Sequence, residues 1–420
     1  GIPERIGYSR DGRGIFLTMP VPFDKMAREL HHSLYYLNLL RSVVLKPVYR
    51  HPWIYLNQEE RLKAQTLLKG KERPVVIVNP GATYGSAKRW PPERFKALSE
   101  RIVSELGGSV LISGSEREVP IAEEIKGALK EIEGVDVIAG RLTLREFIAL
   151  LSQADAVVTN DSGPMHLAYA VGTPLVALFG STSPEHTGPP SFVRAEESGF
   201  KKELEFSLKD RVIRKQLDCS PCFRRNCPEG EPKCLELIGV EEVSSALKEI
   251  LPTRKAVFFD RDGTLCRDAH YLNRWEDLEV FPDIKELGKL KELGYLIVGI
   301  TNQSGIARGI VDEDFVRQVN NYFIEKQGLD AFYYCPHHPD EHCACRKPSP
   351  GMLLRARAEL GIDLKKSIVV GDKESDMELA KAVGCRGFFL RTGQERESKL
   401  ADRGFNNLKE LVQHIVSQRV

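Results

Sequence analysis

Two aspartates, Asp260 and Asp262, follow directly on the apolar run 256–259. Carboxylates at positions i and i+2 of an extended segment point to the same side of the chain. One of them can attack a phosphorus atom while the other hands a proton to the leaving oxygen. Because two like charges this close repel each other, they need a cation, and oxygen ligands favour Mg²⁺. The pair predicts metal-dependent phosphoryl transfer, although the fragment taken alone could also be a solvated turn.

Further polar side chains stand at or after the ends of later apolar runs. Thr301 and Asn302 follow the run 295–300, and Asp372 follows another run later in the chain. Asp372 can supply a third acidic contact, while Thr301 and Asn302 can donate hydrogen bonds to phosphoryl oxygens. Lys347 can neutralise the charge that develops during transfer. Since ligands bind at the carboxyl ends of parallel strands, we expect these side chains to meet at one sheet edge.

The segment 335–345 holds three cysteines and three histidines. Three thiolates and one imidazole are enough for a closed tetrahedral zinc site. The expected ligands are Cys335, His337, Cys343 and Cys345. His338 and His342 compete for the imidazole position, and reduced surface cysteines are the alternative to a metal site. Because four protein ligands leave no open position, the zinc is expected to be structural and to fix the loop that carries Arg346 and Lys347.

A second set of polar residues lies earlier in the chain. The segments 79–82 and 160–166 each follow an apolar run, and the second leads directly into a helical stretch. A helix N-terminus with small residues and free backbone N–H groups suits an anionic phosphate. The sequence contains neither a P-loop nor a Gly-x-Gly-x-x-Gly motif, so neither of those nucleotide sites is indicated. An N-cap followed by a tight turn would explain Asp161 and Gly163 equally well.

These residues are positioned by apolar runs that alternate with amphipathic stretches. The alternation begins near residue 74, is interrupted by the linker 251–254 and resumes at residue 256. Continuously apolar strands between helices predict parallel sheets covered on both faces, and therefore an α/β fold with two units. Residues 1–70 show no such alternation, and we expect them to be the end of a domain that starts before this sequence.

The composition narrows the class of protein. The 420 residues include 60 Lys and Arg against 59 Asp and Glu, a formal net charge of +1. This balance gives no electrostatic reason to expect binding to nucleic acid or to an anionic membrane. No apolar run reaches the ~20 residues of a membrane span and no signal peptide is recognisable, so a cytoplasmic protein is expected. The odd count of nine cysteines argues against a disulfide framework.

Taken in order, four motifs of the second unit resemble the haloacid-dehalogenase (HAD) phosphatase superfamily. They are Asp-x-Asp-Gly-Thr, Thr, Lys and Gly-Asp, found at 260–264, Thr301, Lys347 and 371–372. The resemblance covers about residues 255–395 and implies a HAD-type Rossmannoid domain with a zinc loop. The zinc loop is similar to those of D-glycero-D-manno-heptose-1,7-bisphosphate phosphatases and histidinol-phosphate phosphatases. The stretch 301–309 and the Gly-Asp-Lys motif favour the former, and histidinol-phosphate phosphatase is the alternative.

The resemblance also implies a role for each residue of this site. Asp260 would be the nucleophile that forms an aspartyl-phosphate, and Asp262 would be the general acid/base. Mg²⁺ would be bound by Asp260, by the backbone carbonyl of Asp262 and by Asp372, with Asp376 as a supporting acid. The remaining polar residues would bind the substrate: Thr301, Asn302, Gln303, Arg346, Lys347 and Lys373.

The earlier polar segments resemble the carboxy-terminal, nucleotide-sugar-binding half of lipopolysaccharide heptosyltransferases, which form glycosyltransferase family 9. The match runs from about residue 72 to 250 and implies a GT-B-type, Rossmann-like domain. Carried over, Lys88 would contact the donor phosphate, Glu118 the ribose hydroxyls and Asp161 the heptose hydroxyls. Three residues at a helix start would line the pyrophosphate: Ser162, Gly163 and His166. A plain helix-surface role is the alternative for the histidine.

Together the resemblances predict three regions and two activities. Residues 1–70 would be the remnant of an N-terminal acceptor domain, 71–252 a glycosyltransferase domain and 253–420 a HAD phosphatase domain. We expect a bifunctional enzyme of ADP-heptose and lipopolysaccharide core metabolism that hydrolyses the 7-phosphate of a heptose 1,7-bisphosphate. Its truncated transferase module would bind ADP-heptose without transferring the sugar to a lipopolysaccharide core acceptor. A nucleotide-sugar-binding module with vestigial catalysis is the alternative from another class.

Four further cysteines form a second group: Cys219, Cys222, Cys227 and Cys234. Four thiolates could hold zinc, but their spacing lacks the paired Cys-x-x-Cys symmetry of strong zinc motifs. Metal binding and ordinary reduced cysteines are equally open for this group.

Overall fold

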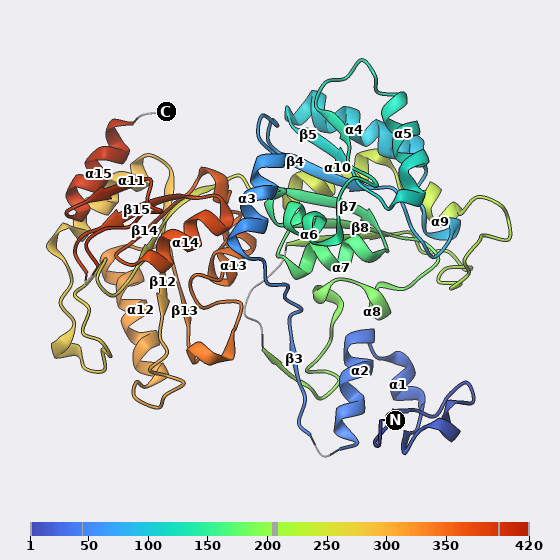
Figure 1. Cartoon of the computed structure of the whole chain (residues 1–420), viewed down its shortest axis with the longest axis horizontal. Helices are drawn as coiled ribbons and strands as arrows, with labels where there is room; N and C mark the ends of the chain where they lie inside the picture. Colours follow the sequence, from blue (N-terminus) through green and yellow to red (C-terminus); the bar gives the residue numbers. More distant parts are fainter. Residues whose placement is uncertain (1, 44, 204–208, 394, 419–420) are drawn as a thin grey trace. The chain divides into compact units, whose positions relative to one another are not determined.

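The computed structural model describes residues 2–43, 45–203, 209–393 and 395–418 (Figure 1). Within these ranges the chain forms two compact units. The first contains residues 2–54, 70–203 and 209–250, and the second contains residues 55–69 and 251–418. This division differs from the predicted boundary at residue 70, because the segment 55–69 packs with the later unit.

Six strands of the first unit form a parallel sheet among the described residues. The strand order is β10-β8-β7-β4-β5-β6, and every neighbouring pair is parallel. The strands are β4 (Val75–Asn79), β5 (Ser109–Ile112), β6 (Val135–Val137), β7 (Ala156–Asn160), β8 (Leu175–Phe179) and β10 (Asp210–Arg214). All residues of β4, β5, β7 and β8 are buried, as expected for strands covered on both faces.

Helices connect these strands. They are α4 (Pro92–Leu106), α5 (Val119–Gly127), α6 (Leu144–Gln153), α7 (Gly163–Ala170), α8 (Pro184–Thr187), α9 (Lys233–Glu236) and α10 (Val240–Ile250). Local signals define their ends. Thr143 and Glu146 form a capping box at the start of α6, and α4 ends at Gly107 with φ 62°. The loops that follow the strands are thereby fixed in length and direction.

The first 54 residues contain short elements that the sequence alternation did not reveal. They are β1 (Ile6–Tyr8), β2 (Met19–Val21), α1 (Lys25–Glu29), α2 (His32–Arg41) and β3 (Val48–Arg50). β1 pairs with β2, and β3 pairs with β9 (Lys201–Glu203). A small core joins α2 to a later segment of the same unit through Leu34, Tyr49 and Phe200. These residues therefore pack as part of the first unit.

The second unit is built on another parallel sheet, of order β13-β12-β11-β14-β15-β16. Its strands are β11 (Lys255–Asp260), β12 (Tyr295–Asn302), β13 (Ala331–Cys335), β14 (Ile368–Gly371), β15 (Arg386–Leu390) and β16 (Arg403–Phe405). Its helices are α3 (Gln58–Leu67), α11 (Gly288–Glu292), α12 (Glu313–Gln327), α13 (Gly351–Leu360), α14 (Glu374–Val383) and α15 (Leu408–Ser417). The predicted α/β class is confirmed for both units.

Three strands of this sheet end where the predicted phosphoryl-transfer site begins. β11 pairs with both β12 and β14. β11 ends at Asp260, β12 at Asn302 and β14 at Gly371, which precedes Asp372. Because the strands are parallel neighbours, these ends lie at the same sheet edge.

No helix in the described part of the chain is long and apolar enough to cross a lipid bilayer.

Candidate functional site

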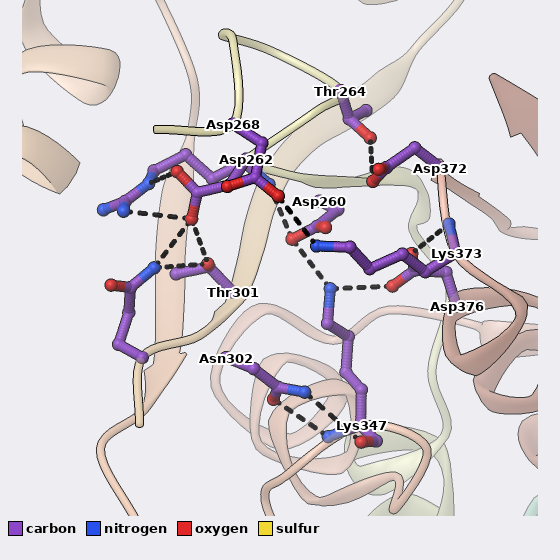
Figure 2. Close-up of polar contacts among 12 residues, drawn as sticks. Asp260, Asp262, Thr264, Asp268, Thr301, Asn302, Lys347, Asp372, Lys373 and Asp376 are labelled. Atoms are coloured by element: carbon purple, nitrogen blue, oxygen red, sulfur yellow. Dashed lines mark hydrogen bonds and ion pairs between the residues drawn. The ribbon is translucent and has the colours of Figure 1, made fainter. Parts of the chain in front are cut away.

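The edge of the second sheet carries a buried chain of ion pairs (Figure 2). Asp260, at the end of β11, is only 3% exposed. Lys347 Nζ lies 2.7 Å from Asp260 Oδ1 and 2.7 Å from Asp376 Oδ1. Burial disfavours the charge of Lys347, but the two carboxylates raise its pKa above its ordinary value. The lysine therefore holds a positive charge beside the predicted nucleophile.

Asn302 fixes the backbone of this lysine. Lys347 N donates to Asn302 Oδ1 at 3.0 Å, and Asn302 Nδ2 donates to Lys347 O at 3.3 Å. These paired bonds tie the end of β12 to the loop that follows the zinc segment. Asn302, predicted to bind substrate, is engaged in positioning Lys347 here.

Asp262 faces a different set of partners. The Arg261 guanidinium donates to both of its carboxylate oxygens, each at 3.0 Å. Gln303 Nε2 donates to Asp262 Oδ2 at 2.8 Å, and Thr301 Oγ1 donates to the same oxygen at 3.3 Å. Burial opposes ionisation, but the Arg261 charge and these hydrogen bonds hold the pKa of Asp262 below its usual value. Arg261, which the sequence pattern left unassigned, is fully buried beside the predicted acid/base.

Three carboxylates form a candidate cation site. One oxygen from each of Asp260, Asp372 and Asp376 lies within 4.8 Å of the others. Asp372 Oδ2 is buried and has no hydrogen-bond partner among the described residues. Burial first, with neighbouring carboxylates, raises the pKa of Asp372 to about 8 and that of Asp260 to about 6. A hard divalent cation fits this oxygen set because it would stabilise the ionised carboxylates.

Asp376 was expected only to support the cation site, yet it lies within the carboxylate cluster as well as beside Lys347.

Gly263 explains how the loop after β11 reaches so close to Asp372. Its φ is 89°, and a Cβ at this position would lie 2.4 Å from Asp372 Oδ2. Only glycine allows both this backbone conformation and this approach.

Two further basic residues belong to the same edge. Lys373 Nζ donates to Asp268 Oδ2 at 3.3 Å (Figure 2). Arg346 Nη1 is buried, and the described residues offer it no hydrogen-bond partner. Both cations were predicted to bind substrate phosphate, whereas Asp268 was not identified from the sequence. Asp268 lies eight residues after Asp260, and nothing in that spacing marks it as a site residue.

The predicted zinc ligands converge. One ligand atom from each of Cys335, His337, Cys343 and Cys345 lies within 4.8 Å of the others. His337 Nδ1 lies 3.2 Å from Cys345 Sγ, and the sulfurs of Cys335 and Cys343 are 3.5 Å apart. Contact with the thiols raises the pKa of His337 to about 10. A tetrahedral metal fits this donor set, since it would take up the negative charge of the thiolates.

The two competing histidines lie outside this cluster. His338 caps a short turn by accepting a hydrogen bond from Asp340 N at 3.3 Å. His342 adopts a left-handed backbone conformation with φ 47°. Neither belongs to the group of candidate metal ligands.

The first unit has a cavity of about 580 Å³ at the ends of its strands. All six predicted donor-site residues line it: Lys88, Glu118, Asp161, Ser162, Gly163 and His166. Lys88 Nζ lies 2.5 Å from Asp161 Oδ2, and Thr182 Oγ1 donates to that oxygen at 2.6 Å. Thr187 Oγ1 donates to the other Asp161 oxygen at 3.3 Å. Neither threonine was predicted as a site residue.

The other lining residues are held by local contacts. Glu118 Oε2 accepts hydrogen bonds from the backbone and hydroxyl of Ser115. A Cβ on Gly81 would lie 2.0 Å from Glu118 Oε1, so glycine lets this carboxylate reach the cavity. His166 Nδ1 lies 2.8 Å from the Tyr169 hydroxyl. The histidine is therefore both anchored by its own helix and part of the cavity wall.

The second cysteine group brings its four thiols near one another, because burial first, and then Cys219, Cys222 and Cys227, raise the pKa of Cys234. Cys219 and Cys222 are exposed, while Cys234 is buried. In the described ranges, the clusters of candidate ligands are the zinc segment and the three carboxylates. Among the described residues, no three of these four thiols come within the 4.8 Å spacing of those clusters, and metal binding by this group stays a prediction.

Comparison with known proteins identifies relatives of both units. The model of glycosyltransferase family 9 (heptosyltransferase) matches residues 1–232, and a HAD-hydrolase-like model matches residues 344–415. D-glycero-beta-D-manno-heptose-1,7-bisphosphate 7-phosphatase of Photorhabdus laumondii is 46% identical over 154 residues, covering 33% of this chain and 81% of that protein. The alpha-anomer phosphatase of the same organism is 40% identical over 153 residues, covering 33% and 84%. Lipooligosaccharide heptosyltransferase 2 of Haemophilus influenzae is 42% identical over 157 residues, covering 35% of this chain and 43% of that protein.

Fold, site and relatives together define a HAD phosphatase joined to a glycosyltransferase domain. The chain belongs to glycosyltransferase family 9 and, through its second unit, to the D-glycero-D-manno-heptose-1,7-bisphosphate 7-phosphatase family. It spans less than half the length of the heptosyltransferase relative. The family 9 match begins at residue 1, so it extends beyond the region 72–250 whose motifs carry the resemblance.

Proposed function

We propose that this chain removes the 7-phosphate of a D-glycero-D-manno-heptose 1,7-bisphosphate through an aspartyl-phosphate. The observation that carries the proposal is the buried ion-pair chain of Asp260, Lys347 and Asp376 at the sheet edge. The phosphatase relatives support the substrate class, and their names include both anomers of the sugar. The first unit is proposed to bind ADP-heptose.

In the first step, a carboxylate oxygen of Asp260 attacks the phosphorus atom at the 7-position. The phosphorus–oxygen bond to the sugar breaks, and the leaving oxygen receives a proton through Asp262, which is ionised in the free site and takes that proton up from the incoming phosphate group. Lys347, 2.7 Å from Asp260, orients the nucleophile and offsets the charge that gathers on the phosphoryl oxygens. The product is an aspartyl-phosphate on Asp260 and a heptose 1-phosphate.

In the second step, water attacks the phosphorus atom of the aspartyl-phosphate. Asp262 accepts a proton from that water, inorganic phosphate leaves, and Asp260 is restored. Thr301 and Gln303 already hold the Asp262 carboxylate by hydrogen bonds, so they set its direction for both proton transfers. Burial of Asp260 and its partners excludes bulk water from the nucleophile.

The two metals have separate roles in this proposal. Mg²⁺ would be held by Asp260, Asp372 and the backbone carbonyl of Asp262, with Asp376 close by, and it would offset negative charge on carboxylate and phosphate oxygens. Zinc would be held by Cys335, His337, Cys343 and Cys345. Because Cys345 is two residues from Lys347, this closed site would fix the loop that presents the lysine.

The donor site of the first unit is proposed on its cavity and the buried ion pair in its wall. Lys88 and the start of α7 supply positive charge and backbone N–H groups for a diphosphate. Glu118 and Asp161 supply acceptors for sugar hydroxyls. The heptosyltransferase relative supports a heptosyl donor as the ligand, and the resemblance of the sequence to these enzymes implies that the donor is ADP-heptose.

The test is phosphate release from purified protein with Mg²⁺. Both anomers of heptose 1,7-bisphosphate are compared with histidinol phosphate at equal concentrations, and ADP-heptose binding is measured by calorimetry in parallel. We expect release of one phosphate from a heptose bisphosphate, leaving heptose 1-phosphate. Faster hydrolysis of histidinol phosphate than of either anomer would overturn the assignment.

A further inference from the structure

Helix α3 lies between two segments of the first unit in sequence, but it packs within the second unit beside α14 (Figure 1). The glycosyltransferase family match, residues 1–232, includes it. Asn57 and Glu60 form a capping box at its start, in which each side chain accepts a hydrogen bond from the other residue's backbone N–H. The helix therefore has a defined N-terminus and is a regular structural element of the phosphatase unit.

One face of α3 is buried. Arg61, Ala64 and Leu68 are 7%, 1% and 7% exposed, whereas Leu62 and Leu67 on the other side are 47% and 48% exposed. The buried positions follow the i, i+3, i+7 spacing of a single helical face. An arginine within such a face needs polar partners, because burying an unpaired charge is strongly unfavourable.

Arg61 Nε donates to Leu56 O at 3.2 Å, just before the helix, and two further contacts of α3 reach the end of α14. Arg61 Nη1 donates to Ala382 O at 3.2 Å, and Gln65 Nε2 donates to Lys381 O at 3.1 Å. Carbonyls in the last turn of a helix lack intrahelical donors, and a positive charge is favourable at that end. Burial lowers the pKa of Arg61 to about 10, so the guanidinium remains charged at neutral pH. The α3 side chains thus cap the carboxyl end of α14.

The other end of α14 carries Asp376, the partner of Lys347. A cavity of about 190 Å³ lies along α3, and its walls include Arg61, Pro348 and Glu378. Pro348 directly follows Lys347, and Glu378 lies two residues after Asp376. Helix α3 therefore faces both the loop and the helix that hold the Lys347–Asp376 ion pair.

We propose that α3 is a positioning element of the phosphatase and that Arg61 is a positioning residue for phosphoryl transfer. By capping α14, Arg61 fixes where that helix lies along its axis, which sets Asp376 against Lys347 and so Lys347 against Asp260. The inference rests on the phosphatase function proposed above. It means that a segment inside the transferase-family match is required for full phosphatase activity.

The test uses Arg61→Ala and Arg61→Lys in the full chain. Lys63→Ala is the matched control, because Lys63 lies on the same helix with its side chain 63% exposed. Hydrolysis of heptose bisphosphate is measured together with hydrogen–deuterium exchange of segments 346–350 and 374–383. We expect Arg61→Ala to lower kcat about 3- to 30-fold with KM changed less than about twofold. Exchange in both segments should become faster, Arg61→Lys should recover part of both effects, and Lys63→Ala should change neither.

Each outcome decides the inference. Wild-type kcat and exchange in Arg61→Ala would overturn it, as would a loss of kcat fully explained by the unfolded fraction. If the wild-type chain hydrolyses none of the substrates, the proposed function fails, and exchange alone decides the role of α3. Faster exchange in Arg61→Ala but not in Lys63→Ala would then support the positioning role, and unchanged exchange would overturn it.

Discussion

The two sites of this chain are built at the same kind of sheet edge but are prepared for their ligands in different ways. In the second unit, Asp260, Asp372 and Asp376 crowd together around a buried lysine. In the first unit, a cavity of about 580 Å³ has a buried ion pair, Lys88–Asp161, in its wall. Crowded like charges raise pKa values and favour a cation and a phosphoryl group, which is typical of catalytic sites. A roomy cavity with few convergent polar groups is typical of binding.

The contrast predicts that hydrolysis and donor binding can be disrupted independently in this polypeptide. A substitution in the carboxylate cluster should abolish hydrolysis and leave donor binding unchanged. A substitution in the cavity wall should do the reverse. Four variants test this separation.

Asp260→Asn removes the nucleophilic oxygen while keeping the size of the side chain. We expect phosphate release to fall by at least about 10³-fold, because loss of a nucleophile removes the covalent route entirely. ADP-heptose affinity, measured by calorimetry, should stay at its wild-type value. Substantial residual hydrolysis would show that another residue attacks the phosphorus atom.

Lys347→Met removes the positive charge between Asp260 and Asp376. The two buried carboxylates would then repel each other without a counter-charge, and charge on the phosphoryl group would not be offset. A fall in kcat of roughly 10²- to 10³-fold is expected. Steady-state kinetics with heptose bisphosphate provide the measurement, and a change confined to KM would contradict a role in the chemical step.

Asp161→Asn tests the other side of the comparison. Lys88 would lose its counter-charge, and the acceptors proposed for sugar hydroxyls would be altered. ADP-heptose affinity is expected to weaken about 10- to 100-fold, the range for charged hydrogen bonds. The phosphatase kcat serves as the control and should not change. Equal loss of both activities would argue that the variant unfolds or that the two sites are coupled.

Cys343→Ser removes one thiolate from the zinc segment. Zinc content should fall by one ion per chain, because a closed structural site depends on all four ligands. The loop that carries Lys347 would loosen, and kcat is expected to fall roughly tenfold. His342→Asn is the matched control, since His342 lies in the same segment but outside the four candidate ligands, and asparagine tolerates its left-handed backbone. An identical zinc content in the two variants would refute the assignment of ligands.

Much of the phosphatase site could be predicted from sequence, because its residues stand directly after strands. Asp260 and Asn302 each end a strand, and Asp372 follows one. The parallel sheet then brings them together without any further condition. The convergence of Cys335, His337, Cys343 and Cys345 was equally predictable, since three cysteines and a histidine at such close spacing are typical of a metal site.

What could not be predicted depends on partners far away in the chain. The stretch around Arg61 has the pattern of a charged surface helix, and the carbonyls of Leu56 and Ala382 make the burial of its guanidinium favourable. Asp268 is ordinary in sequence until Lys373 approaches it. Conversely, Cys219 and Cys222 are close in sequence, yet the fold leaves them exposed. Each of these cases depends on tertiary contacts, which cannot be inferred from the local sequence.

The most direct test is to trap the covalent intermediate. Protein is mixed with heptose bisphosphate labelled with ³²P at the 7-phosphate, quenched in acid within one turnover and digested for peptide mapping. We expect label on the peptide that contains Asp260, and no labelled peptide from Asp260→Asn. Label on a different peptide, or turnover with no label on the protein at all, would contradict it.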